Sequence, residues 1–307
     1  MLSGTFFLET AARNALFLSR DSLRIEDLGL DFKLASARDL DGTGWVLLSP
    51  REEEAQGKAE SERCILKFVS GKIPAHVPDW RVFTPELIAY PCIPGSPAMV
   101  LDRTPHAKNK HQWRFDRKNP PSAFLESLAE NILALHRLNV EEGIEAGVPA
   151  FTPMEFRRAV AKRIENCRLF VDIHESWLRR WHAWLADDEG WPDYVTMNHG
   201  DLQPTHLLLT EDNRVNGILD WAHGRFTDPA VDLAMIYRNF GARMLDEILE
   251  RHGKADGRAW PGMRAHVIDL ASTCPIALAE FGALSGKNHV LEEARAILSQ
   301  PDETGDA

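Results

Sequence analysis

The chain has 307 residues, of which 44% are apolar and 26% charged, and its formal net charge is −11. This is the composition of an ordinary globular protein, long enough for one large domain or two smaller ones. The acidic excess argues against nucleic acid as the main partner; it suits a small cationic ligand, or serves solubility alone. The four cysteines form no CxxC pair, which favours a reducing cytoplasm. We expect neither a signal peptide nor a membrane span, because no basic leader and no uninterrupted run of about 18 apolar residues is present.

The first third of the chain has the pattern of a small antiparallel sheet. Apolar β-type segments at 23–37 and 45–49 flank a polar turn at 39–44, which predicts a hairpin. The other elements expected here are a short helix at 10–18, a helix at 52–69, and strands at 80–83 and 87–90.

A break at 91–97, rich in proline, separates this sheet from the rest of the chain. We place a lobe boundary there, which gives an N-terminal lobe of residues 1–94 and a C-terminal lobe of residues 95–307. A strand at 99–102 and a polar, basic surface loop at 103–121 come next. Helices are expected at 123–138 with Ser122 as the N-cap, and at 153–170, 176–186, 233–240, 244–252, 262–282 and 289–298. The expected fold class is therefore α+β, with a small sheet lobe and a larger helical lobe.

Two acidic residues in the stretch 197–234 have the pattern of a reactive site. Asp201 lies in a His-Gly-Asp sequence, and Asp220 ends a short apolar segment. A loop aspartate by itself is more often a cap or a turn residue, and the second acidic centre is what favours a site. Asp228 and Asp232 fit a loop and a helix start, so we interpret both as structural.

A β-hairpin is expected between the two acidic residues. It is formed by apolar residues 207–209, a polar turn at 211–214 and the apolar segment before Asp220. Such a hairpin brings Asp201, His206 and Asp220 together at one end. One carboxylate that orients a hydroxyl, and a second that holds Mg²⁺ with a neighbour, are what phosphoryl transfer requires. His206 fits either a metal ligand or a turn histidine.

Two other patterns carry less weight. His199 with Asp201 and His206 has the residue types of a hydrolytic metal site, but this interpretation leaves Asp220 and the small first lobe unexplained. Residues 282–288 resemble a P-loop, but they have too few spacer residues and no preceding strand, so we interpret them as a helix end.

The motifs HGDLQPTH, ILDW and DPAVDLA together resemble those of the aminoglycoside phosphotransferase-like kinases, which are bilobal relatives of the protein kinases. Most members have Asn at the position of His206, and a histidine there resembles the macrolide 2'-phosphotransferase branch. Further segments that resemble this branch are Asp27–Phe32, Val77–Val82, Ala89–Pro91 and Trp191–Asp193.

The resemblance implies a role for each matching residue. Asp201 would orient or deprotonate the acceptor hydroxyl, and His206 and Asp220 would hold Mg²⁺ at the nucleotide phosphates. Glu62 would steady a phosphate-binding cation. The backbone of the hinge would meet the purine through Tyr90, Cys92 and Ile93. The resemblance also implies GTP in preference to ATP as donor. We further expect a monomer in the cytoplasm.

The implied acceptor is the 2'-hydroxyl on the amino sugar of a macrolide. Such a ligand is a large apolar ring with a protonated amine, so it needs an apolar groove with an acidic rim. Candidates for this groove are Met235, Ile236, Tyr237, Phe240, Met244, Ile276, Leu278 and Phe281, with Asp246 and Glu280 at the rim. Apolar residues at helical spacing are more often part of a core.

One position departs from the family pattern. Leu48 stands where the strand should carry the Lys or Arg that contacts phosphate, and leucine cannot donate to phosphate oxygens. Arg51 is the first candidate for a substitute, with Lys58 and Lys67 as others. Two alternatives therefore stay open: a kinase-fold protein with weak or no activity that binds nucleotide or macrolide, and a small-molecule kinase with another acceptor.

Overall fold

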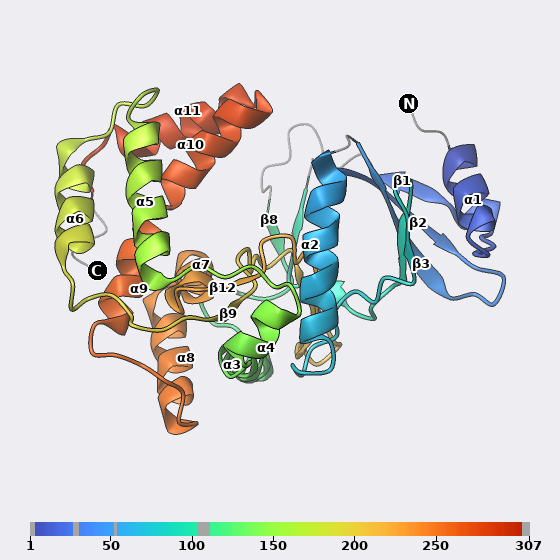
Figure 1. Cartoon of the computed structure of the whole chain (residues 1–307), viewed down its shortest axis with the longest axis horizontal. Helices are drawn as coiled ribbons and strands as arrows, with labels where there is room; N and C mark the ends of the chain where they lie inside the picture. The colour runs from blue at the N-terminus through green and yellow to red at the C-terminus, as the bar shows by residue number, and fades with distance from the viewer. Residues whose placement is uncertain (1–3, 27–30, 52–53, 103–110, 303–307) are drawn as a thin grey trace.

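The structure is a computed structural model that describes residues 4–26, 31–51, 54–102 and 111–302. It has a small antiparallel sheet lobe followed by a larger, mainly helical lobe, and Figure 1 shows helix α2 (Glu54–Val69) between the two. The α+β, two-lobed fold predicted from the sequence is therefore confirmed.

The sheet of the first lobe has the strand order β1-β2-β3-β5-β4, with antiparallel pairing throughout. Its strands are β1 (Arg24–Glu26), β2 (Phe32–Arg38), β3 (Gly44–Pro50), β4 (Val82–Phe83) and β5 (Ile88–Pro91). Helix α1 (Gly4–Arg13) begins earlier than the helix expected at 10–18, and a 3-10 turn, η1 (Arg20–Ser22), leads into β1. Phe7 of α1 packs with Ala35 and Leu47 in a small separate core on one face of the sheet.

Helix α2 belongs to the larger core through its second half. Ile65, Phe68 and Val69 are buried with residues of the helical lobe rather than with the sheet. The segment after α2 then joins the predicted hairpin, because His76 N–H donates to the carbonyl oxygen of Asn216 at 2.8 Å. Helix α2 precedes the lobe boundary proposed at residue 94, but its second half packs in the core of the helical lobe.

Among the described residues, the second lobe contains three short sheets and most of the helices. Strands β7 (Met99–Leu101) and β8 (His111–Trp113) form a hairpin, and β6 (Ser96–Pro97) pairs with β10 (Leu207–Leu209). The helices are α3 (Ser122–His136), α4 (Val140–Glu145), α5 (Pro153–Cys167), α6 (Glu175–Ala186), α7 (Ala230–Phe240), α8 (Ala242–Lys254), α9 (Met263–Ser272), α10 (Cys274–Ser285) and α11 (Asn288–Leu298). The P-loop-like stretch is the end of α10 and the turn into α11, as interpreted from the sequence.

Three details of these helices differ from the sequence predictions. The helix expected at 262–282 is divided into α9 and α10, because Pro275 has no N–H to continue α9 and fits the first turn of α10. Ser122 is the first residue of α3 rather than its N-cap, which is Pro121. Helix α4, a short element capped by Asn139, was not predicted.

One stretch of the described residues, Met263–Ser285, is long and apolar enough to cross a membrane by length and composition alone. It is formed by α9 and α10, and these pack against α7 and α11. Because core helices of globular lobes pass the same test, the stretch is weak support for a membrane span.

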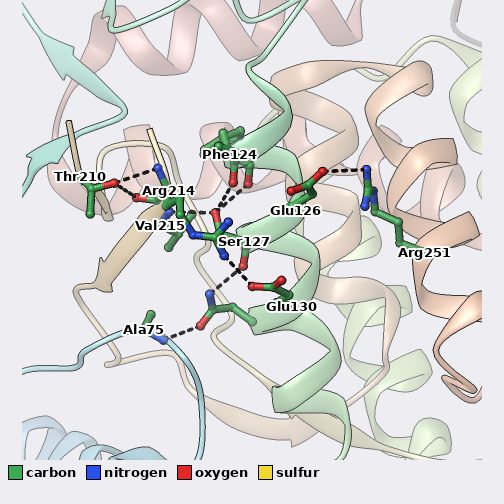
Figure 2. A network of polar contacts seen from close by, with 11 residues as sticks. Ala75, Phe124, Glu126, Ser127, Glu130, Thr210, Arg214, Val215 and Arg251 are labelled. Carbon is green, nitrogen blue, oxygen red and sulfur yellow. Dashed lines mark hydrogen bonds and ion pairs between the residues drawn. The ribbon is translucent and has the colours of Figure 1, made fainter. Parts of the chain in front are cut away.

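A buried polar network ties α3 to the hairpin that carries the acidic residues (Figure 2). Ser127 Oγ accepts a hydrogen bond from Val215 N–H at 2.9 Å. Asn131 accepts one from Ala75 N–H at 2.9 Å and donates to the carbonyl oxygen of Ser127 at 2.7 Å. Because buried polar groups are stable only when paired, this network fixes the position of the hairpin relative to both lobes.

Candidate active site

The hairpin predicted between the two acidic residues is present. Strands β10 (Leu207–Leu209) and β11 (Val215–Ile218) pair antiparallel, and Leu207 lies opposite Ile218. Beside them, β9 (Thr196–Asn198) pairs with β12 (Arg225–Thr227). The loop after β9 and the loop after β11 therefore leave these sheets close together, and they carry Asp201 and Asp220.

His206 lies between the two carboxylates. Its Nδ1 is 2.9 Å from the carbonyl oxygen of Asp201, and its Nε2 is 3.6 Å from Oδ2 of Asp220. A carbonyl oxygen only accepts hydrogen bonds, so Nδ1 carries a proton and donates to Asp201, which leaves Nε2 directed at Asp220. The structure thus brings together the three residues that the sequence singled out.

Gly200 is required at the start of this loop. Its φ is +84°, and a Cβ at this position would lie 2.3 Å from the carbonyl oxygen of His223. The backbone of the Asp201 loop and the backbone after Asp220 therefore approach so closely that only glycine fits.

His199 has a structural position. It is fully buried, its Nε2–H donates to the carbonyl oxygen of Leu219 at 2.9 Å, and its Nδ1 accepts from Asp201 N–H at 3.2 Å. Burial, followed by the nearby His206 ring, lowers the pKa of His199 to about 3, so the ring is neutral. With both nitrogens bonded, His199 offers no lone pair to a metal, and this removes the hydrolytic metal site considered from the sequence.

Asp232 holds the same loop from α7. Its carboxylate accepts hydrogen bonds from His199 N–H at 2.7 Å and Gly200 N–H at 2.9 Å. Burial raises the pKa of Asp232 to about 6. Asp228 accepts from Ala230 N–H and contacts Nε2 of a buried histidine of α9, so both aspartates are structural, as the sequence indicated.

Glu62 lies against the turn that carries Asp220. The side chain is buried, and its carboxylate accepts a hydrogen bond from Trp221 N–H at 3.0 Å. Burial, followed by the negative charge of Asp220, raises the pKa of Glu62 to about 8. Within the described residues, no Lys or Arg forms an ion pair with Glu62. Burial also raises the pKa of the neighbouring Tyr90 hydroxyl.

Leu48 lies on the face of β3 opposite α1. Leu47 is fully buried in the core beneath α1, and its neighbour Leu48 therefore points to the opposite face of the sheet. Two of the residues proposed to replace the phosphate-binding cation contact Asp31. Lys58 forms an ion pair with its carboxylate at 2.8 Å, and the backbone N–H of Arg51 donates to its carbonyl oxygen.

At the hinge, the backbone of Cys92 is turned toward the sheet. Its N–H donates to the carbonyl oxygen of Gly44 at 2.8 Å, so this group is not open to a ligand. Tyr90 lies opposite Val46 in the same ladder. Because backbone groups alternate in direction along an extended strand, the carbonyl of Pro91, the last residue of β5, points the other way.

The residues predicted for an apolar groove are not all on one surface. Phe240 is buried and packs against the rings of Trp113 and Phe124, so it is a core residue. Tyr237 lines a cavity of about 240 Å³ among α6, α7, α9, α10 and α11. Phe281 lies beneath the ammonium group of Lys287.

The predicted acidic rim is already paired. Glu280 binds Arg163 at 2.6 Å, and Asp246 binds Arg264 at 2.6 Å. A cationic ligand would therefore compete with an arginine at either residue. The first-strand motif Asp27–Phe32 lies partly outside the described residues.

The fold and this site together define a kinase-like phosphotransferase, and comparison with known proteins gives the family. Residues 23–266 match the phosphotransferase enzyme family (APH), and the chain belongs to that family. It is 31% identical over 271 residues to the "Uncharacterized protein YcbJ" of Bacillus subtilis (strain 168), a match that covers 88% of each chain.

Two solved structures resemble the chain over nearly its full length. Macrolide 2'-phosphotransferase MphH from Brachybacterium faecium, as the apoenzyme, has 32% identity and a TM-score of 0.84, over 96% of this chain and 98% of that one. A macrolide 2'-phosphotransferase type I has 34% identity and a TM-score of 0.87, over 96% of each chain. The GDP and kanamycin complex of APH(2")-IIia, at 16% identity and a TM-score of 0.78, shares the fold.

Proposed function

We propose that the protein is a macrolide 2'-phosphotransferase, which transfers the γ-phosphoryl group of GTP to the 2'-hydroxyl of the amino sugar and so gives macrolide resistance. The observation that carries this proposal is the arrangement of Asp201, His206 and Asp220 around one point. It occurs in a chain that is 32% and 34% identical to two macrolide 2'-phosphotransferases.

In this proposal Asp201 is the catalytic residue. Its carboxylate is 30% exposed, so an acceptor hydroxyl can reach it, and its backbone is held on both sides by His199 and His206. A carboxylate in this position orients the hydroxyl and takes its proton as the bond to phosphorus forms.

His206 and Asp220 are the proposed ligands of Mg²⁺. The orientation of His206 fits this role, since its Nδ1 is bonded to the carbonyl oxygen of Asp201 and its Nε2 faces Asp220. Among the described residues, no group of three or more His, Cys, Asp or Glu side chains is placed to hold a metal ion. This fits Mg²⁺, which binds through one or two protein ligands together with phosphate oxygens and water. The bound ion would neutralise the charge of the phosphates.

We place the nucleotide between the lobes, with the N-terminal lobe (1–94) as the nucleotide-binding part and residues 95–307 as the catalytic and acceptor-binding part. Pro91 C=O points away from β3, and we propose it, together with the backbone of Tyr90, Cys92 and Ile93, as the contacts to the purine. Arg51 remains the proposed substitute for the missing phosphate-binding cation. The preference for GTP rests on the resemblance to the macrolide branch.

The acceptor would lie on the helical lobe beside Asp201. Met235, Tyr237, Phe281 and Glu280 are the residues we propose for it; Phe240 would support them from the core. A protonated amine would be attracted to the carboxylates of the site itself. We propose a monomer in the cytoplasm that binds neither nucleic acid nor membrane.

The test is incubation of the protein with GTP, Mg²⁺ and a panel of macrolides and aminoglycosides, followed by mass measurement of every acceptor. The proposal predicts one added phosphate on a macrolide and none on an aminoglycoside. Phosphate on another acceptor alone would support the small-molecule kinase with a different substrate.

Leu48 favours a second candidate, a protein of this fold that binds nucleotide or macrolide with weak or no turnover. The support is that Glu62 has no cationic partner among the described residues, so one contact to phosphate is missing. Tight binding of nucleotide and macrolide without phosphate transfer would establish this alternative.

A further inference from the structure

Helix α2 is docked directly on the turn that carries Asp220. Glu62 accepts the hydrogen bond of Trp221 N–H at 3.0 Å, and the two residues are 159 positions apart in the chain. Both groups are buried, so this bond is shielded from water.

A second contact from the same helix supports the turn. A Cβ at Gly224 would lie 2.8 Å from Cγ2 of Ile65, so the backbone there touches the helix. Glu62 and Ile65 are three residues apart and hence lie on one face of α2. Helix α2 therefore holds the chain at two points just beyond Asp220.

The turn needs this support because of its backbone. Asp220 has φ +63°, in the left-handed region that residues other than glycine rarely adopt. Nearby, Leu219 N–H donates to the carbonyl oxygen of His206, and Gly224 N–H to that of Trp221. Glu62 adds the contact from α2.

A carboxylate at this position would ordinarily be explained by a partner cation on β3, but Leu48 stands there and Lys58 is bound to Asp31. We propose that Glu62 is a positioning residue, whose function is to accept the Trp221 N–H bond and so hold Asp220 in place for metal and nucleotide. The inference rests on the proposed function only in naming Asp220 as a metal ligand.

Two variants separate the accepting oxygen from the acid. Glu62→Gln keeps a carbonyl oxygen of the same reach but cannot ionise, whereas Glu62→Met keeps the packing and loses the acceptor. Glu60→Gln is the matched control, since Glu60 is an exposed acid on the same helix. Thermal melting first shows that each variant is folded.

The first readout is hydrogen exchange of residues 218–224 in the protein without ligand. We expect Glu60→Gln to match the wild-type protection within about twofold, and Glu62→Gln to keep protection at least as high as that of the wild type. In Glu62→Met we expect a loss of roughly tenfold or more, because a buried N–H is left unpaired.

The second readout is the affinity for Mg²⁺ in the presence of GDP, measured by calorimetry. Glu62→Met should weaken it by roughly tenfold; Glu62→Gln should not. If an acceptor is phosphorylated, Glu62→Met should lower kcat and leave the KM of the acceptor unchanged. The kcat of Glu62→Gln should equal that of the wild type.

Equal damage in Glu62→Gln and Glu62→Met would overturn the inference, because the carboxylic acid itself and not its accepting oxygen would then matter. A Glu62→Met variant that matches the wild type in exchange and in Mg²⁺ affinity would overturn it as well. Neither binding readout needs an acceptor, so a failure to phosphorylate macrolides leaves this test intact.

Discussion

Replacement of Gly200 by alanine tests whether the Asp201 loop depends on its close approach to the backbone after Asp220. Alanine at this position lowers the stability of the folded state for two separate reasons. Its φ of +84° is unfavourable for alanine, and the added Cβ would lie 2.3 Å from the carbonyl oxygen of His223 and 2.9 Å from its carbon. These are backbone atoms, so the two loops have to move apart by several tenths of an ångström or more.

The structure provides a control for the first penalty alone. Gly42 has φ +87° and has nothing within 4 Å of a Cβ position. Gly42→Ala should therefore lower the free energy of unfolding by only about 1–2 kcal/mol, the cost of the left-handed conformation. Gly200→Ala should lower it by about 2–5 kcal/mol, since an overpacking cost of about 1–3 kcal/mol is added.

The assay is denaturant unfolding of both variants, followed by a steady-state rate for phosphate transfer. We expect the Gly42→Ala rate to equal the wild-type rate. The Gly200→Ala rate should fall by roughly a hundredfold, because a displacement of about 1 Å at the reacting group has that effect. Equal stability and equal rates in the two variants would refute the claim that the Asp201 loop depends on this close approach.

Three further predictions follow from the site. Asp220→Asn should weaken Mg²⁺-dependent nucleotide binding, measured by calorimetry, more than His206→Asn does. The first change removes an anionic oxygen ligand, whereas the second replaces the imidazole with a carbonyl ligand; the reverse order would contradict the metal assignment. Leu48→Lys should raise kcat/KM for the nucleotide by roughly tenfold, as one charge-assisted contact is added; a neutral result would mean that this strand does not face phosphate. Burial beside Asp220 and Tyr90 raises the pKa of Glu62 to about 8 from an ordinary 4.5. Between these two pH values the folded state binds one proton more than the unfolded state, so the free energy of unfolding falls as pH rises from about 4.5 to about 8. Urea unfolding without Mg²⁺ should therefore show Glu62→Gln gaining stability over the wild type between pH 5 and 8, by up to about 5 kcal/mol; parallel curves would show that Glu62 is charged throughout.

The sequence predicts the parts of this site that are local in the chain. The hairpin between Asp201 and Asp220 follows from alternating apolar and turn residues, and it brings His206 to both carboxylates. The two-lobed fold follows from the order of strand-like and helix-like segments together with the family motifs. Both depend on short-range patterns that periodicity can reveal.

Contacts between distant segments could not be predicted in the same way. The bond from Glu62 to Trp221 joins positions 159 residues apart, and nothing near either residue indicates it. The pairing of Glu280 with Arg163 likewise depends on how α10 packs on α5.

Two details that the sequence analysis did not resolve have separate causes. Pro275 is the signal that divides the stretch 262–282 into two helices, and it was available in the sequence. The inward direction of Cys92 N–H depends on the register of β5 against β3, which the sequence does not specify.

The most direct test of the central claim is the turnover of a macrolide with GTP and Mg²⁺ by the wild type and by Asp201→Ala, with the phosphorylated product quantified by mass. Nucleotide affinity and unfolding are measured on both proteins as controls. We predict that the variant loses at least roughly a hundredfold in rate, because a positioned general base contributes that much, and that it folds and binds nucleotide as the wild type does. A variant that keeps more than about a tenth of the wild-type rate would contradict the role of Asp201 in phosphoryl transfer.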